Sequence, residues 1–260
     1  MSYVVLETIK ELTHKVMQNN NEKIESIGIS FPGTVTDDTV IKTDNLGIYN
    51  FKITEELKKD FNVPIKLGND AKCAAIAEKS FGSLKEADDA LFLTIGTGVG
   101  GAAFLNGKLL RPKRYCGFEV GHIVIVKDGI QCNCGRKGCF ETYSSMKNLK
   151  QKISNEFELN NTDGKIIKDF IMQNINDEKI NRILDEYIEY LTIGIANLIN
   201  ILEPEVISIG GSFTYYKDIL LYRLENKLGE KTELFNKDSV PKIVMAEFKN
   251  DAGIIGATMI

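Results

Sequence analysis

The sequence predicts an α/β protein built from two lobes, and three observations lead to this prediction. Short runs of β-branched and aromatic residues alternate along the chain with amphipathic or alanine-rich helix patterns. A chain of 260 residues can form one large domain or two small ones. The charged segment Leu84–Asp89 is a suitable hinge between two lobes.

Composition excludes several classes of protein. The apolar content of 43% and the charged content of 26% are those of a soluble globular protein. A net charge of −4 gives no basic surface for nucleic acid. The chain has no apolar run long enough to cross a bilayer, and its start lacks the pattern of a signal peptide. Five cysteines form an odd set, of which three are better used on a metal, so we expect a reducing, cytoplasmic location.

The first lobe is expected to begin with a helix, because the apolar residues of Val4–Gln18 fall on one helical face. Ile24–Phe31 is a short β-rich run and predicts a buried strand. Thr36–Phe51 is rich in turn residues and is expected to form loops. Ile53–Phe61 predicts a helix, and Val63–Leu67 predicts a second strand.

The next segment, G-N-D-A-K-C-A-A-I-A-E, passes from a strand into an alanine-rich helix that begins near Asp70. Asp70 has two interpretations. It can be the N-cap of the helix, the commonest role of Asp at that position. It can also be a general base that accepts a hydroxyl proton while the hydroxyl oxygen attacks phosphorus.

The second lobe is expected to open with a strand over Ala90–Ile95, a glycine-rich segment at Gly96–Gly101, and a strand over Ala102–Leu110 that contains a tight Asn106-Gly107 turn. Because the glycine-rich segment joins strand to strand, it is neither a Walker P-loop nor a dinucleotide fingerprint, which both require a following helix. Its backbone N–H groups and threonine hydroxyl can hold polyphosphate oxygens. A plain glycine-rich hairpin is the alternative.

The remaining elements are mainly helical. Met146–Tyr190 is polar and helical, and Ile183–Leu202 predicts a stronger helix. The strand Val206–Ile209 then ends in Gly210-Gly211, at the kind of position where open α/β sheets bind nucleotides. A helix over Lys217–Lys227, a strand over Lys242–Ala246 and a terminal helix capped by Asp251 complete the predicted set.

The strongest motif runs from Cys116 to Ser145 and contains E-V-G-H and C-N-C-G-R-K-G-C-F-E. It offers one imidazole and three thiolates, a complete tetrahedral set for a structural Zn²⁺ with no open position. The expected ligands are His122, Cys132, Cys134 and Cys139. Ordinary buried thiols or a disulfide are the alternative, which the clustering disfavours. Glu119 and Glu141 flank the ligands, so the metal would hold two carboxylates beside it.

These motifs, together with N-D-A at Asn69–Ala71, resemble the signature of the ROK family (repressors, open reading frames and sugar kinases) over about Ile24–Ile260. The resemblance implies a two-lobed actin-like ATPase (ribonuclease H-like) fold with the active site between the lobes. The smaller lobe would be residues 1–83 with 251–260, and the larger would be residues 84–250. It implies ATP-dependent phosphorylation of a hexose of the glucose or N-acetylmannosamine type, with Mg²⁺ and structural zinc, in a homodimer.

The resemblance also assigns residues. Asp70 would be the general base. The implied hexose ligands are Asn45, Asn69, Asp70, Glu119, His122 and Glu141, and the implied ATP contacts are Gly96, Thr97, Gly98, Gly100, Gly210 and Gly211.

Two features depart from the family pattern. Phe118 stands where the family usually has glycine. The D-x-G-G-T phosphate loop, which follows the first strand of the family pattern, does not occur in the sequence, so we expect the N-terminal strands to be missing. A start site placed too far downstream, a fragment, and a catalytically impaired member that only binds sugar are three explanations that remain open.

Overall fold

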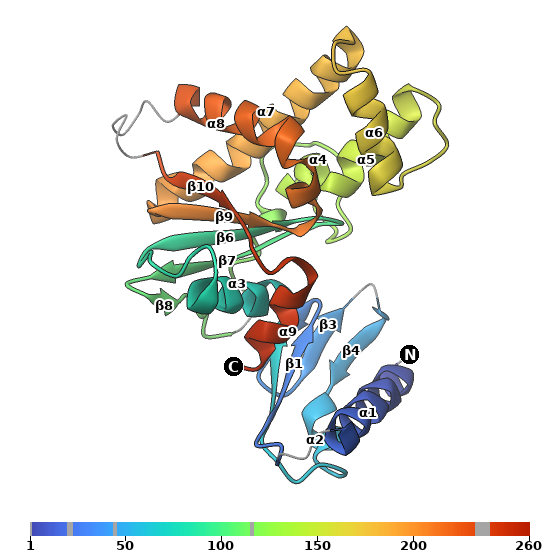
Figure 1. Ribbon diagram of the computed structural model, residues 1–260, viewed down its shortest axis with the longest axis vertical. Helices are drawn as coiled ribbons and strands as arrows, with labels where there is room; N and C mark the ends of the chain where they lie inside the picture. Colours follow the sequence, from blue (N-terminus) through green and yellow to red (C-terminus); the bar gives the residue numbers. More distant parts are fainter. Residues whose placement is uncertain (1, 20–22, 44–45, 115–116, 232–239) are drawn as a thin grey trace. The chain divides into compact units, whose positions relative to one another are not determined.

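The computed structural model describes residues 2–19, 23–43, 46–114, 117–231 and 240–260, and it divides into two compact units (Figure 1). Unit 1 contains Met1–Phe81, Arg111–Gly117 and Asn250–Ile260, and unit 2 contains Gly82–Leu110 and Phe118–Lys249. The division expected from the sequence differs from this one chiefly at residues 111–117, which it placed in the second lobe.

Unit 1 contains two small sheets. Strands β1 (Ile27–Phe31) and β5 (Ile65–Asn69) pair in parallel, with Phe31 opposite Asn69. Strands β2 (Thr34–Val35), β3 (Val40–Thr43) and β4 (Ile48–Phe51) form an antiparallel sheet. Helices α1 (Ser2–Asn19) and α2 (Ile53–Leu57) share one apolar core with these strands. Figure 1 shows both helices at the blue end of the chain. The buried residues of that core are Leu6, Phe31, Val35, Val40, Ile48, Ile53, Leu57, Phe61, Ile65 and Leu67.

Helices α3 (Asp70–Phe81) and α9 (Ala252–Ala257) of unit 1 pack closely because small residues line their contact. A Cβ on Gly256 would lie 1.7 Å from the carbonyl oxygen of Cys73. On the α3 side, Ala71, Ala75 and Ala77 are buried, and Ala74 is partly buried. Only small side chains permit backbones to approach to this distance. The helix that begins at Asp70 is therefore firmly held.

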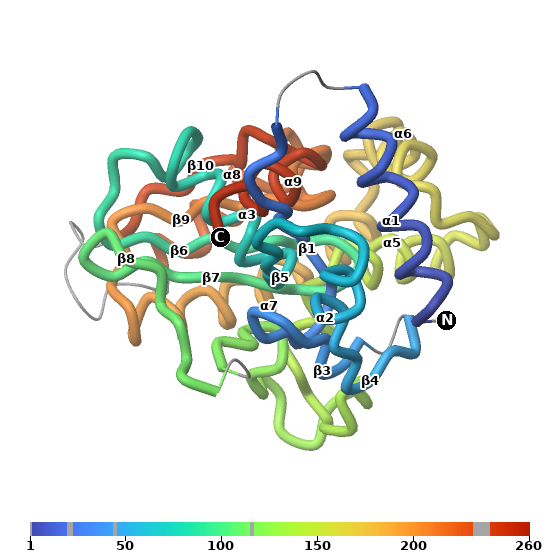
Figure 2. Tube along the Cα trace, turned by 90° about the horizontal axis from the view of Figure 1, so that it is seen from below, coloured from blue at the N-terminus to red at the C-terminus, as the bar shows by residue number. Residues whose placement is uncertain are grey.

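Unit 2 is built on a five-stranded mixed sheet in the order β10-β9-β6-β7-β8. Strands β6 (Ala90–Ile95), β9 (Val206–Gly210) and β10 (Lys242–Met245) are parallel, and β7 (Val99–Leu105) and β8 (Lys108–Leu109) complete the sheet antiparallel to their neighbours. Figure 2 shows β9, β6 and β7 running side by side. Because the parallel strands β6 and β9 end at the same edge, their following turns are neighbours.

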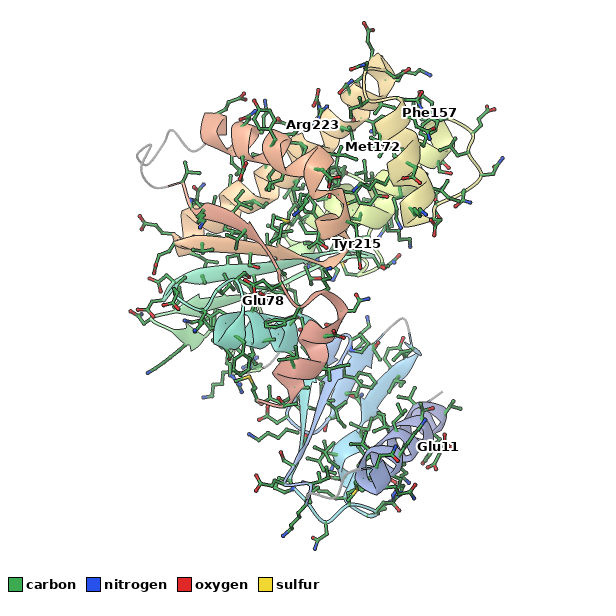
Figure 3. The ribbon with its side chains drawn as sticks, viewed as in Figure 1. Glu11, Glu78, Phe157, Met172, Tyr215 and Arg223 are labelled. Atoms are coloured by element: carbon green, nitrogen blue, oxygen red, sulfur yellow. The ribbon has the colours of Figure 1, made fainter. Side chains whose placement is uncertain are left out.

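Helices cover one face of this sheet (Figure 1). They are α4 (Phe140–Ser144), α5 (Met146–Glu156), α6 (Gly164–Gln173), α7 (Glu178–Leu202) and α8 (Lys217–Lys231), with the short 3₁₀ helices η2 (Val120–His122) and η3 (Gly211–Tyr216) between elements. Alternate residues of β6, namely Leu91, Leu93 and Ile95, point into the core with the apolar stripe of α7. Arg223 on α8, labelled in Figure 3, pairs with Asp185 on α7.

Local sequence explains the limits of the long helix α7. The Asp177 side chain accepts hydrogen bonds from the N–H groups of Lys179 and Ile180 at 2.8 and 3.1 Å, so it is the N-cap. At the other end Glu203 adopts a left-handed conformation with φ 45°, and Pro204 follows. Because proline cannot continue a helix, α7 ends at Leu202, as the sequence predicted.

Several sequence predictions need correction. Thr36–Phe51 was expected to be loop, but it contains β3 and β4, two short strands in which Val40, Thr43 and Ile48 are buried. The first strand begins at Ile27 rather than Ile24, and α2 ends at Leu57 rather than Phe61. Asp251 was expected to cap α9, yet its side chain makes no capping hydrogen bond. Among the described residues, no helix is both long enough and apolar enough to span a membrane.

Candidate active site and metal site

The four predicted metal ligands converge in unit 2. One ligand atom from each of His122, Cys132, Cys134 and Cys139 lies within 4.8 Å of all the others. The Cys132 sulfur is 3.7 Å from His122 Nδ1, and the sulfurs of Cys134 and Cys139 are 3.6 Å apart. Sulfur ligands of a tetrahedral zinc site, with Zn–S bonds of about 2.3 Å, lie roughly 3.8 Å apart. The donor set and its spacing therefore fit Zn²⁺.

Two glycines shape the loop that carries the thiols, Cys132–Cys139, which we call the metal loop. Gly135 and Gly138 have φ values of 89° and 76°, in the left-handed region that favours glycine. The N–H of Cys132 donates to the carbonyl of Arg136 at 2.8 Å, which closes the tight turn around Cys134. A Cβ on Gly138 would lie 1.7 Å from the Val126 carbonyl oxygen, so the loop packs against the preceding segment without room for a side chain.

Electrostatics also favour a cation at this cluster. Desolvation raises the pKa of Cys132 and of Cys139, and the neighbouring sulfurs raise that of Cys139 further. For Cys134 desolvation acts in the same direction, but hydrogen bonds from Arg136 and from the other thiols hold its pKa below the usual value. Three thiols this close cannot all ionise without a compensating positive charge. A dication supplies that charge.

Glu119 and His122 are fixed by η2. Glu119 is exposed, and its carbonyl oxygen accepts a hydrogen bond from the N–H of His122 at 3.0 Å. Nδ1 of His122 faces the cysteine cluster, so Nε2 is the ring nitrogen left for another partner. Phe118, just before Glu119, has φ 65°, a conformation that suits glycine and strains a bulky residue. The sequence departure at this position therefore falls on a strained backbone next to a candidate sugar ligand.

Glu141 is positioned by α4, which begins immediately after Cys139. The ring of Phe140 packs against Gly194 of α7, where a Cβ would lie 2.2 Å from the ring. The side chain of Thr142 donates to the Cys139 carbonyl at 2.6 Å and so ties the helix to the metal loop. From this base the Glu141 carboxylate reaches β7, where its Oε2 accepts the N–H of Val99 at 3.0 Å.

The two predicted ATP-binding turns lie together in unit 2. We call Gly96–Gly98, the connection between β6 and β7, the glycine turn. A Cβ on Gly211, which has φ 73°, would lie 2.7 Å from the carbonyl oxygen of Ile95, the residue just before the glycine turn. The strand β7 begins at Val99 rather than at the expected Ala102, so Gly100 lies within β7 opposite Thr94 and not in the loop. Its contact with ATP stays a prediction. Ser212 was not predicted, although its N and Oγ lie 3.8 Å from a Cβ on Gly96.

In unit 1, Asn69 and Asp70 form the corner between β5 and α3. Asn69 Oδ1 accepts the N–H of Lys72 at 3.1 Å, so Asn69 provides the N-cap interaction that one interpretation gave to Asp70. The Asn69 amide donates to the Gly33 carbonyl at 2.9 Å and to Asp70 Oδ1 at 3.1 Å. Desolvation raises the pKa of the Asp70 carboxyl, although hydrogen bonds from Ala71 and Asn69 oppose this effect. Asn45 lies outside the described residues.

The fold and these sites define a class of protein. The structure matches that of a ROK family glucokinase from Streptomyces griseus, solved with glucose and AMPPNP, with a TM-score of 0.85, 24% identity, and coverage of 99% of this chain and 87% of that one. This likeness confirms the predicted actin-like ATPase fold of the sugar kinases. The ROK family profile matches residues 2–260, so the chain belongs to the ROK family.

Relatives in this family have more than one function. The chain is 31% identical over 251 residues to a glucokinase of Halalkalibacterium halodurans, covering 88% of this chain and 74% of the relative. It is 28% identical over 249 residues to a xylose repressor of Caldicellulosiruptor bescii, covering 90% of this chain and 61% of that protein. The relatives of this chain thus include both glucokinases and xylose repressors.

Proposed function

We propose that the chain is an ATP-dependent hexose kinase of the glucokinase type. One observation carries the proposal: in unit 2 the Glu141 carboxylate touches the glycine turn through the Val99 N–H at 3.0 Å. A carboxylate is a strong acceptor for sugar hydroxyls, and a turn of glycine N–H groups is a donor site for phosphate oxygens. The two kinds of group needed for phosphoryl transfer to a sugar therefore share one site.

The sugar would be held by polar groups that the metal loop keeps rigid. Glu141 and Glu119 supply carboxylate acceptors, and His122 supplies Nε2 while its Nδ1 faces the cysteines. Zinc, bound by the four converging ligands, would fix this loop without taking part in the reaction. Asn45 and Asn69 are further candidate hexose ligands. The preferred sugar would be of the glucose or N-acetylmannosamine type.

The reaction would transfer the γ-phosphoryl group of ATP to a sugar hydroxyl. The hydroxyl oxygen forms a bond to the γ-phosphorus, the bond from that phosphorus to the bridging oxygen breaks, and ADP leaves. Asp70 would accept the hydroxyl proton, and its raised pKa suits that task better than an ordinary aspartate would. Mg²⁺ bound with ATP would neutralise charge on the phosphates. The N–H groups of the turns at Gly96–Gly98 and Gly210–Ser212 would orient the phosphates.

The test is ADP production from ATP across a panel of hexoses that includes glucose and N-acetylmannosamine. Asp70→Asn should lower turnover by about 10²- to 10⁴-fold while hexose binding, measured by calorimetry, is retained. Asp163→Asn is the matched control, since Asp163 caps α6 and Asn preserves that cap. Full turnover in Asp70→Asn would place the general base elsewhere.

A second candidate function is sugar binding without phosphoryl transfer, which the xylose repressor relative favours. The same panel separates the two. A hexose that raises the melting temperature while no ADP forms with any sugar would support the second function and reject the kinase. The homodimer and the cytoplasmic location stay predictions.

A further inference from the structure

The glycine turn has two backbone donors that no other group in the described part of the chain accepts. The N–H of Gly96 donates to the Gly98 carbonyl at 2.9 Å, and the Gly96 carbonyl accepts the N–H of Lys147 at 3.2 Å. Among the described residues, the N–H groups of Thr97 and Gly98 have no acceptor. Successive free N–H groups at a turn form an anion-binding concavity. How tightly this concavity can bind an anion depends on how firmly the peptides of the turn are oriented.

The Glu141 carboxylate fixes the peptide that ends the turn. Its Oε2 accepts the Val99 N–H at 3.0 Å, a hydrogen bond across 42 residues of sequence. The same oxygen lies 2.2 Å from where a Cβ on Gly98 would be, and the carboxyl carbon lies 3.1 Å from it. The space left by the absent side chain of Gly98 is therefore occupied by the carboxylate. A bond to a charged acceptor is stronger than a neutral one.

The other end of Val99 is held as well. Its carbonyl oxygen lies 2.0 Å from where a Cβ on Gly121 would be, so η2 packs directly against this backbone. Gly121 precedes His122, and Glu141 follows Cys139 by two residues. Both groups that hold Val99 are thus adjacent to metal ligands. Ordering of the metal loop would therefore reach the turn through these two contacts.

We propose that Glu141 is a positioning residue for nucleotide binding: its carboxylate fixes the Gly98–Val99 peptide so that the glycine turn receives polyphosphate. This inference rests on the kinase function proposed above and adds a second role to a residue assigned there to the sugar. It also makes nucleotide affinity depend on the metal loop. A residue that only bound sugar would leave nucleotide affinity unchanged when replaced.

The charge and the hydrogen bond of Glu141 have different effects, and this difference gives a sharp test. Glu141→Gln keeps an oxygen for the Val99 N–H but removes a negative charge near the phosphates. Glu141→Ala removes both. Calorimetry with AMPPNP and Mg²⁺ should therefore give an affinity for Glu141→Gln equal to or tighter than that of the unmodified chain. The affinity of Glu141→Ala should be weaker by about tenfold or more.

A nucleotide-independent readout accompanies these titrations. The amide resonance of Val99 in a ¹⁵N–¹H spectrum should shift and exchange faster in Glu141→Ala, and Glu141→Gln should largely restore it. Chelation of the metal should move the same resonance and weaken AMPPNP binding. Glu119→Gln is the matched control, because Glu119 is also a proposed sugar ligand. It should weaken glucose binding and leave both the AMPPNP affinity and the Val99 resonance unchanged.

Gly98→Ala provides a second route that leaves Glu141 in place. The added methyl group would lie against Glu141 Oε2 and displace it, so AMPPNP affinity should fall as in Glu141→Ala. Gly229→Ala is its control, since a Cβ there meets nothing within 4 Å. Unchanged AMPPNP affinity in Glu141→Ala would overturn the inference alone. If the unmodified metal-loaded chain binds no AMPPNP, the proposed function falls and the inference falls with it.

Discussion

The corner at Asp70 in unit 1 and the contact of Glu141 in unit 2 each hold a carboxylate, but they do so by different means. Asp70 is held by its sequence neighbours, through the Ala71 N–H at 2.9 Å and the Asn69 amide at 3.1 Å. Glu141 is held by Val99, which is 42 residues away. The first arrangement forms with its helix. The second exists only when β7 and the metal loop are both in place.

The two carboxylates therefore depend on different interactions to hold them in position. The Asp70 corner depends on a helix cap and on close packing of small residues, with no metal ligand nearby in the sequence. The Glu141 contact depends on a loop whose three closely spaced thiols need a cation to compensate their negative charge when they ionise. Metal should therefore stabilise the Glu141 region and leave the Asp70 corner nearly unaffected.

Metal removal is the strongest test of this contrast and should have the largest effect. Structural zinc contributes about 10 kcal/mol or more to the folding of small zinc-binding domains. Chelation should therefore lower the melting temperature markedly. After chelation, the backbone amides of residues 118–145 should lose their protection from hydrogen exchange, and those of residues 65–81 should keep it. Cys139→Ala should lose the metal, whereas Cys73→Ala should keep it, because Cys73 lies in α3 outside the cluster. Equal loss of protection in both segments would contradict the contrast.

Replacement of Asn69 tests the corner in unit 1 and should have an intermediate effect. Asn69→Ala removes the cap on Lys72 and the amide links to Gly33 and Asp70, so we expect a loss of about 2–3 kcal/mol in the free energy of unfolding. Asp163→Ala is the comparison, since Asp163 acts only as the cap of α6 and should cost about 1 kcal/mol. Urea denaturation measures both. Equal costs would show that the Asn69 amide contributes nothing beyond capping.

The pH dependence of Asp70→Asn should be the smallest effect. Desolvation raises the folded-state pKa of Asp70, so folding favours its protonated form. Protonated Asp70 therefore contributes to the stability of the fold at pH values below the ordinary aspartate pKa. This contribution is lost as the pH rises through the raised pKa of the folded state. Asn, which stays neutral, should therefore raise the melting temperature more at pH 7 than at pH 3. Because the residue keeps an exposed surface, its desolvation is only partial, and solvent screening keeps the difference on the order of 1 °C. A larger rise in melting temperature at pH 3 than at pH 7 would contradict a raised pKa for Asp70.

Local patterns predicted the elements whose signals are strong. The strand Ala90–Ile95 and the helix start at Asp70 are confirmed, because continuous apolar runs and a strand-to-helix polar pair are read directly from the sequence. The sheet at residues 34–51 was missed, since strands of two to four residues with turn residues between them give no clear alternation. One of the two interpretations of Asp70 made it the N-cap, but Asn69 makes the capping hydrogen bond. Asn and Asp are both good caps, and only their contacts distinguish them.

The sequence by itself determined the family, the α/β class and the four candidate metal ligands, because these depend on residue types at short spacings. Only the tertiary structure decided that Glu141 binds Val99, that Gly98 and Gly121 leave room around that residue, and that Gly210–Ser212 lies beside the glycine turn. The physical reason is that each of these contacts joins segments far apart in the chain. Their meeting is set by the register of the sheet and by the packing of α4 on α7, which no local pattern specifies.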